Sequence, residues 1–372
     1  MSLNKSLYFP GLNGIRAFAA MAVVISHINN RLELFDVSGL PLMNMADFAV
    51  SVFFSLSGFL ITYLLLLELK NTGSINIKSF YVRRILRIWP LYYLYLFLSA
   101  LVMGFDTLTW VFLLYIFILP NFRNSLAQFF NGAVSSLSFG NYLVGHYWSL
   151  GVEEQFYAFW PWFIRRNKKI LQFLIVFPFV FILLKVVLNL LNAPYSILVF
   201  VNYSRFGCMA IGALGAYLYF YHKDLILRLN NRYLEIATYI FFILIIFNKF
   251  KISSAIDHEI ASFFTLVLII SQISNPEKLI SFENPIFNFL GKISFGLYVW
   301  NPLVIYLCSF VLIDFLSIFN FSNTINLIIV FVFNIFFIIL VSYLSYEYFE
   351  KRFLKIKKKF MIVKSSNAAH EK

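Results

Sequence analysis

Long apolar runs are the feature of this sequence that most constrains its fold. Each run matches the hydrocarbon thickness of a bilayer when it folds as a helix, because about 20 residues rising about 1.5 Å each span that layer. Only 13% of the 372 residues are charged, about half the share usual in a soluble domain. The sequence therefore predicts an all-α polytopic membrane bundle of about ten transmembrane helices, near residues 12–29, 46–68, 90–105, 148–164, 170–191, 205–221, 233–249, 258–273, 290–313 and 325–347.

The distribution of basic residues predicts that both termini are cytoplasmic. With the N-terminus inside, the inner loops hold KNTGSINIKSFYVRRILR, RRNKK and HKDLILRLNNR, and the basic end holds KRFLKIKKK. The outer loops then hold few Lys or Arg residues, as the positive-inside rule requires. A further run at 107–119 is too short for an easy span and is expected to be interfacial or re-entrant. The net charge of +13 is thus explained by topology, and no nucleic-acid partner is predicted.

We expect one membrane domain over residues 1–350 and a basic amphipathic cytoplasmic tail over 351–372, lying on the inner leaflet of the lipid bilayer. A cleaved signal peptide is not expected, because Arg16 divides the charged start from the first apolar core and no soluble domain follows. Cys208 and Cys308 both lie inside apolar runs without paired spacing, so neither a disulfide framework nor a metal site is predicted.

The first apolar run carries two ionisable residues, Arg16 and His27. Eleven residues at 100° each return almost to the starting direction, so both side chains lie on one helical face, about 16 Å apart. Ionisable groups inside a bilayer are costly and are usually functional or paired. The structural alternatives are that Arg16 snorkels to the inner surface and that His27 is an interfacial residue.

Two more polar clusters are candidates for function. Glu153 and Glu154 are adjacent carboxylates entering a predicted span, and because neighbouring helical positions point about 100° apart, at most one can face a given pocket. Arg83, Arg84 and Arg87 form a basic face on a helix at the inner surface. That face fits either an amphipathic inner-leaflet helix or a site for an anionic, phosphate-rich cofactor.

Several motifs in order give the chain a resemblance to the membrane-bound acyltransferase 3 family, which O-acylates glycans and other acceptors. They are LNGIRAFAAMAVVISHI with Arg16 and His27, VFFSLSGFLIT, FYVRRILRIWPLYY with Arg84 and Arg87, HYWSLGVEEQFYAFWP with Trp148, Glu153, Glu154 and Tyr157, and, more loosely, GKISFGLYVWNP and YEYFEKRF. The sequence departs from the family pattern at Ser51, where Asp is usual, at Asn301, where His is frequent, and at Arg352, where Pro is common.

The resemblance implies an acyltransferase that uses acetyl-CoA or another acyl-CoA as its donor and no metal. It implies that Arg84 and Arg87, with Arg16 and Arg83, bind the donor. His27 would act as the general base or, in an alternative route, form an acyl-enzyme. Glu153 or Glu154 would orient His27 or hold the acceptor. The oxyanion stabiliser stays open, with Asn301, Tyr298 and a serine of SLSG as candidates. The remaining expected substrate-binding residues are Trp148, Tyr157, Tyr298 and Asn301.

The implied acceptor is a hydroxyl group of a glycan or glycoside, such as a cell-surface polysaccharide or its lipid-linked precursor, and the implied location is the inner (plasma) membrane of a bacterium. No fused hydrolase-like domain is expected, so the chain would complete the transfer itself or hand the group to a separate extracytoplasmic transferase or glycan-assembly protein. Composition alone fits a transporter or flippase of a small anion or lipid-linked sugar equally well. A non-catalytic scaffold is the third alternative.

Overall fold

The computed structural model describes residues 8–39, 45–105, 111–123, 125–126, 142–167, 169–319 and 321–362. Helices joined by turns and loops make up these ranges. No β-strand occurs in these ranges, so the predicted all-α class is confirmed. The elements, with 3₁₀ and π segments marked η, are α1 Leu12–Asn29, η1 Leu32–Phe35, α2 Met45–Thr72, α3 Ile77–Met103, α4 Phe112–Ile116, η3 Pro120–Phe122, η5 Gly145–Tyr147, α7 Trp148–Arg166, α8 Ile170–Leu190, α9 Tyr195–Ser204, α10 Phe206–Tyr221, α11 Lys223–Ile226, η6 Leu227–Leu229, α12 Arg232–Ile246, α13 Asp257–Ser274, α14 Pro285–Lys292, α15 Ser294–Phe319, α16 Asn323–Ser345, η7 Tyr346–Glu350 and α17 Lys351–Lys358.

Every predicted span coincides with a helix, namely α1, α2, α3, α7, α8, α10, α12, α13, α15 and α16. Among the described residues, seven helical segments are long and apolar enough to cross a membrane, and α11 to α12 form an eighth candidate that bends by 57°. The predicted spans outside this set are α7 and α13, of 19 and 18 residues. A polytopic membrane bundle is therefore confirmed, while the count of ten and the side on which the termini lie stay predictions.

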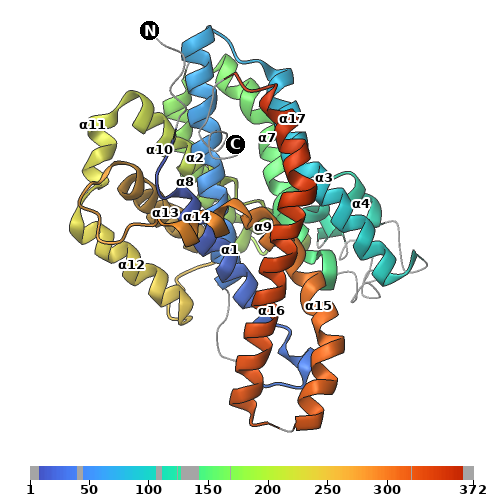
Figure 1. Cartoon of the computed structure of the whole chain (residues 1–372). Coiled ribbons are helices and arrows are strands. Elements are labelled where there is room, and N and C mark those ends of the chain that lie inside the picture. The colour runs from blue at the N-terminus through green and yellow to red at the C-terminus, as the bar shows by residue number, and fades with distance from the viewer. Residues whose placement is uncertain are drawn as a thin grey trace.

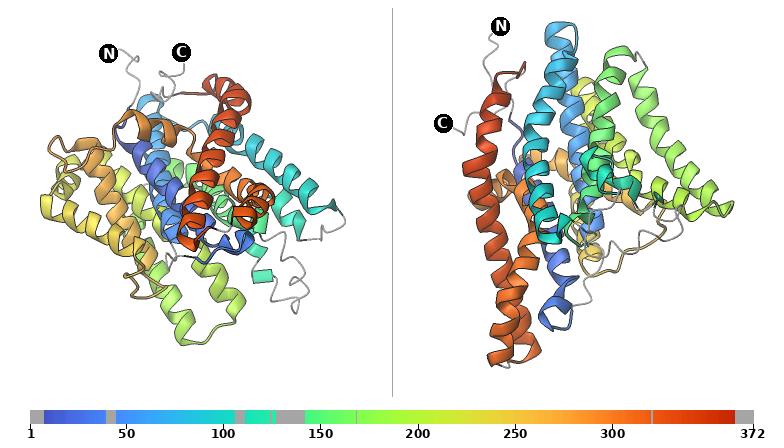
Figure 2. Two further views of the ribbon diagram at one scale, coloured as in Figure 1. Left: turned by 60° about the horizontal axis from the view of Figure 1, so that its bottom comes forward. Right: turned by 90° about the vertical axis from the view of Figure 1, so that its right-hand side faces the viewer.

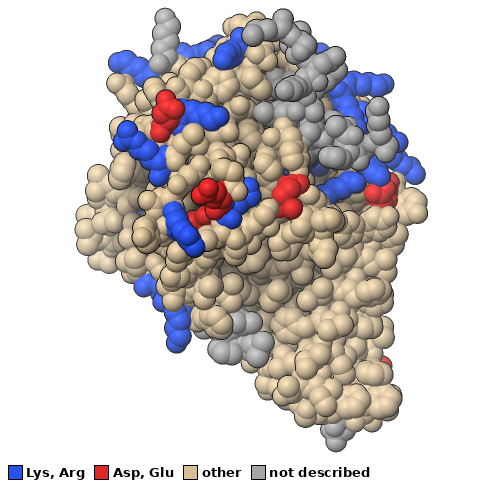
Figure 3. Space-filling model, turned by 60° about the vertical axis from the view of Figure 1, so that its left-hand side comes forward, with Lys and Arg blue, Asp and Glu red and all other residues tan. Residues whose placement is uncertain are grey.

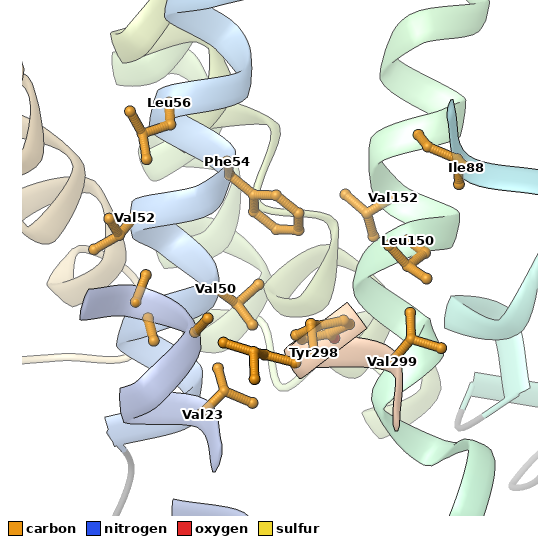
Figure 4. Packing of buried hydrophobic residues seen from close by; sticks show 14 of the residues in the cluster. Val23, Val50, Val52, Phe54, Leu56, Ile88, Leu150, Val152, Tyr298 and Val299 are labelled. Atoms are coloured by element: carbon orange, nitrogen blue, oxygen red, sulfur yellow. The ribbon is translucent and has the colours of Figure 1, made fainter. Parts of the chain in front are cut away.

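Helix α2 runs through the middle of the bundle and packs against α1, α7, α10 and α13 (Figure 1). Helices α15 and α16 pair as a hairpin that extends beyond the other helices at the lower end of the view (Figure 2). Apolar side chains of α1, α2, α7 and α15 converge between these helices (Figure 4), among them Val23, Val50, Leu150 and Tyr298, all of them buried. This packing brings together most of the helices that carry the predicted site residues.

The basic helix α17 does not begin a separate unit. The segment Asn323–Lys358 is continuous, because the π segment η7 joins α16 to α17 without a break. Helix α17 packs against α3, and Arg83 Nη1 of α3 donates a hydrogen bond of 2.9 Å to the carbonyl oxygen of Phe360. The first part of the expected tail is thus docked on the bundle, whereas residues 363–372 lie outside the described ranges.

The two ends of the described chain lie on one side of the bundle. Tyr8 and Met361 line the same cavity, together with Lys357 and Lys358 of α17. Lys and Arg side chains gather over the upper part of the face in Figure 3, and the part that extends below is almost uncharged. This charge distribution supports the predicted inner surface at the end that carries α17.

The run predicted to be interfacial, 107–119, is described only from residue 111 onward. That part contains α4, which is five residues long, and the start of η3 follows it. Helix α3, by contrast, is longer than the expected third span, because Ile77–Met103 forms one helix that carries both the basic residues and the apolar run. Pro90 lies inside α3 without ending it.

Glycines allow α2 and α10 to pack with their backbones in contact. A Cβ atom added at Gly58 would lie 2.0 Å from the carbonyl oxygen of Met209, and one added at Gly212 would lie 2.0 Å from that of Ser55. Real Cβ atoms do not approach backbone oxygens so closely, so any side chain here would push the helices apart. Small residues that permit close approach are the usual means of helix association in membranes.

We expect Gly58→Ala or Gly212→Ala to destabilise the folded protein by about 1–3 kcal/mol, because overpacking forces backbone shifts. The measurement is the thermal midpoint of the purified protein in detergent. Gly39→Ala is the matched control, since an added Cβ there would meet nothing closer than 3.7 Å. Equal midpoints for all three variants would contradict the close α2–α10 contact.

Candidate functional site

His27 lies near the end of α1 and is held by a residue 274 positions further along the chain. Its Nδ1 atom is 2.6 Å from Oδ1 of Asn301 on α15. Asn301 is fully buried, and its Nδ2 group donates to the carbonyl oxygens of Leu297 and Tyr298 at 2.9 and 2.7 Å. Because both donors of the amide are used in this way, Oδ1 must accept, and His27 Nδ1 must carry the proton. The neutral imidazole therefore presents its lone pair on Nε2.

A cavity of about 210 Å³ opens between α1, α2, α3, α7 and α15. We call it the arginine cavity, because Arg16, Arg84 and Arg87 all line it. Glu153 and Tyr157 of α7 and Tyr298 of α15 line it as well. The structure thus brings together six of the predicted site residues, which come from four helices.

A second cavity, of about 460 Å³, adjoins the first, with Arg16 and Arg87 lining both. We call it the basic vestibule, because Lys292, Lys357 and Lys358 also line it. Its carboxylates are Glu283 and Glu350. The two cavities form one basic path that leads from the α17 end of the bundle into its interior.

The charges in the arginine cavity do not balance. Its wall carries three guanidinium groups and Lys357 against one carboxylate, that of Glu153. Within the described ranges, none of Arg16, Arg84 and Arg87 forms an ion pair. Placing cations in a bilayer without counter-charges is costly. The cavity is therefore suited to an anion, above all to a phosphate, which arginine binds through paired hydrogen bonds.

The two adjacent carboxylates of α7 have different surroundings, as the 100° helical step requires. Glu153 faces the arginine cavity and accepts a hydrogen bond from Ser57 Oγ. Glu154 points toward α3, where Trp89 Nε1 donates to Oε2 at 3.4 Å. The Nδ1 atom of His27 bonds to Asn301 rather than to either carboxylate, and the expectation that Glu153 or Glu154 orients the imidazole or holds the acceptor stays a prediction.

Five of the predicted residues do not line the arginine cavity. Two of these, Arg83 and Trp148, have partners elsewhere in the bundle. Arg83 projects from α3 toward the end of α2, where it pairs with the buried Glu68 at 3.2 Å. Trp148 lies beneath the guanidinium group of Arg205, which is 4.8 Å from the ring centroid. Arg205 in turn pairs with Asp47 at 3.5 Å. These contacts give Arg83 and Trp148 structural partners of their own.

Tyr298 connects the arginine cavity to His27. Its side chain lines the cavity, its carbonyl oxygen accepts from Asn301, and its hydroxyl is 2.6 Å from Ser149 Oγ. The same hydroxyl donates to the carbonyl oxygen of His146. Sequence reasoning named a serine of SLSG, the stretch that contains Ser57, as a candidate oxyanion stabiliser. It did not select Ser149 or His146 as site residues. Their position within or next to the quoted motifs was the available signal.

A buried lysine and the two cysteines lie in settings that indicate structural roles. Lys185 pairs with Glu259 at 2.6 Å, both buried, which accounts for an otherwise isolated cation in the apolar helix α8. Cys208 and Cys308 are free and buried. Within the described residues, no group of three His, Cys, Asp or Glu side chains could hold a metal ion.

Comparisons with known proteins agree with the sequence motifs. A family model described as an acyltransferase domain matches residues 9–347. The "Putative O-acetyltransferase SACOL0978" of Staphylococcus aureus strain COL is 28% identical over 380 aligned residues, covering 94% of this chain and 58% of the relative. The "O-acetyltransferase OatA" of Staphylococcus aureus strain NCTC 8325 is 29% identical, covering 57% of this chain and 35% of the relative.

A third relative, the "Putative peptidoglycan O-acetyltransferase YrhL" of Bacillus subtilis strain 168, is 34% identical over 42% of this chain and 24% of its own length. The chain therefore spans little more than half the length of the curated relatives it matches. No solved structure matches it. Because the family model covers nearly all of the sequence, in a helical membrane bundle that carries the quoted motifs, the chain belongs to the acyltransferase 3 family.

Proposed function

We propose that this protein is an integral membrane O-acetyltransferase that moves an acetyl group from cytoplasmic acyl-CoA to a hydroxyl group of a glycan or glycoside. The observation that carries the proposal is the arginine cavity, whose three guanidinium groups have no ion-paired carboxylate in the described structure. Tyr298 of its wall accepts a hydrogen bond from Asn301, the residue that holds His27. The names of the bacterial relatives support O-acetyl transfer, and the long apolar helices support a location in the plasma membrane. One of those names includes peptidoglycan, which supports a cell-envelope polysaccharide or its lipid-linked precursor as the acceptor.

The donor would bind along the basic path. Coenzyme A carries a pyrophosphate and a 3′-phosphate, which suit Arg84, Arg87 and the lysines of the basic vestibule. Its pantetheine arm would extend along α1 from Arg16 toward His27, a rise of about 16 Å. In this arrangement the phosphates stay at the inner surface while the thioester reaches the interior of the bundle.

His27 would act as the general base. Its Nε2 lone pair takes the proton of the acceptor hydroxyl as the hydroxyl oxygen attacks the thioester carbon. The carbon–sulfur bond then breaks, and the proton passes from Nε2 to the leaving thiolate. Asn301 keeps Nε2 free for this step, because it holds the other ring nitrogen. Glu153 would keep the arginine side chains in place before the donor binds.

We expect His27→Ala to reduce acetyl transfer by about 10²–10⁴-fold, the usual contribution of a general base. The assay follows radiolabel from acetyl-CoA into glycan and lipid fractions, with the purified protein in proteoliposomes. A normal gel-filtration profile shows that the variant is folded. Full activity in His27→Ala would refute its role as the base. If the wild type neither transfers the label nor hydrolyses the thioester, the transporter is the better explanation.

Asn301→Leu is expected to lower kcat by about 10²-fold while leaving the KM for acetyl-CoA nearly unchanged, because the imidazole is then no longer held in its reactive orientation. Asn301→His, the residue frequent in the family, should recover most of the loss. Steady-state kinetics measure both effects. A rise in KM without a fall in kcat would instead place Asn301 in donor binding.

Neutralising Arg84 and Arg87 together, as Arg84→Gln and Arg87→Gln, should abolish the rise in thermal midpoint that CoA produces in the wild type. Arg83→Gln is the control: it removes one positive charge from the same helix but lies outside the arginine cavity, so CoA should still raise its midpoint. An equal loss of the CoA effect in the control would show that only the net basic charge matters.

A further inference from the structure

His146 is a buried histidine beside His27, the first residue of the motif HYWSLGVEEQFYAFWP, and the donor path assigns it no role. It lies in η5, immediately before α7, with 8% of its surface exposed. Its ring centroid is 5.5 Å from that of Tyr95, 4.8 Å from that of Tyr147 and 5.3 Å from that of Tyr298. The centroid of the His27 ring is 6.3 Å away, with the two imidazole planes at 78°. The two imidazoles are therefore adjacent and nearly perpendicular, with three tyrosine rings around His146.

The backbone around His146 is fixed without help from its ring. Tyr298 donates its hydroxyl to the carbonyl oxygen of His146 itself. Tyr95 donates to the carbonyl oxygen of Leu143 at 2.7 Å, and Arg31 donates to that of Tyr142 at 2.6 Å. These bonds come from three different helices or their ends. The backbone carbonyl groups of this segment therefore anchor it to the rest of the bundle, and the imidazole of His146 is not needed for that purpose.

The ring nitrogens of His146 are unused. In the described structure, neither Nδ1 nor Nε2 has a hydrogen-bond partner, although both are buried. The carbonyl groups of Leu143 and Val299 are near the ring but do not complete a bond of normal geometry. Burying a polar group without a partner is unfavourable, and such groups in native proteins require an explanation.

The spacing of the two imidazoles fits a reacting group between them. A hydrogen-bonded oxygen lies roughly 4 Å from an imidazole centroid, given a heavy-atom distance of about 2.8 Å. Centroids 6.3 Å apart therefore leave both rings within reach of the same or adjacent oxygen atoms. Two other candidate donors are already occupied: the amide of Asn301 bonds to backbone carbonyls, and the hydroxyl of Tyr298 bonds to His146.

We propose that His146, in its neutral form, donates an N–H hydrogen bond to the thioester carbonyl oxygen as that oxygen becomes negatively charged. This inference rests on the proposed acetyl transfer. The acceptor O–H bond breaks and its proton moves to His27 Nε2, while the acceptor oxygen bonds to the carbonyl carbon. The displaced electron pair resides on the carbonyl oxygen beside His146 until the carbon–sulfur bond breaks. His146 keeps its own proton throughout, so it is a catalytic residue that does not titrate.

The test compares His146→Leu and His146→Gln with the wild type in the proteoliposome assay. His146→Leu should lower kcat by about 10²–10³-fold, the usual effect of removing one oxyanion donor, with little change in the KM for acetyl-CoA. His146→Gln keeps an N–H donor and should recover part of this loss. The pH dependence of kcat/KM should be unchanged in His146→Gln, because His27 remains the titrating base.

Thermal stability distinguishes this role from a structural one. Because the ring nitrogens are unpaired, His146→Leu and His146→Phe should melt at the wild-type temperature or above it, although both should show the same large loss of kcat. Wild-type kcat in His146→Leu would overturn the inference while leaving the proposed function intact. A lower melting temperature in both apolar variants, with activity falling in proportion to folded protein, would also overturn it. Failure of the wild type to transfer acetyl groups at all would instead refute the proposed function.

Discussion

The cost of an uncompensated charge in a hydrocarbon layer separates the structural from the functional ionisable groups of this protein. Lys185 is paired with Glu259, and Arg83 with Glu68, at distances typical of a direct ion pair. Arg16, Arg84 and Arg87 have no such partner in the described structure and instead face a shared cavity. A bundle that satisfies some of its buried charges internally but leaves three cations open is prepared for an anionic ligand. In the proposed function, the phosphates of the acyl-CoA donor would supply the counter-charges that the three arginines lack.

The geometry around His27 shows how a neutral residue can replace a charged one as the orienting group. A carboxylate or a second histidine could change its protonation state with its surroundings, whereas an amide cannot. Asn301 fixes the imidazole only because its own donors are held by two carbonyl groups of α15. Asn301, which stands where His is frequent in the family, therefore removes a titrating group while still holding the His27 imidazole at Nδ1.

Much of this arrangement could be predicted from the sequence, because the periodicity of a helix sets the angles between its residues. This periodicity predicted that Arg16 and His27 share one helical face and that the side chains of Glu153 and Glu154 point in different directions. It could not tell that Arg84 and Arg87 face the cavity while Arg83 faces Glu68, since absolute rotation depends on packing partners distant in sequence. The bond between His27 and Asn301 crosses 274 positions. That both ring nitrogens of His146 are buried without a hydrogen-bond partner in the described structure depends on the residues packed around it, which the sequence does not specify.

The continuous helix from α16 through α17 has a consequence for handling the protein. Lys357 lies within the basic end that looks, in sequence, like an appendage, yet it lines both the arginine cavity and the basic vestibule. Shortening the chain at residue 350 would remove part of the cavity wall together with a cation, and not merely trim a tail. Fusion tags and truncations are therefore better placed beyond residue 362, where they spare every lining residue that the structure describes.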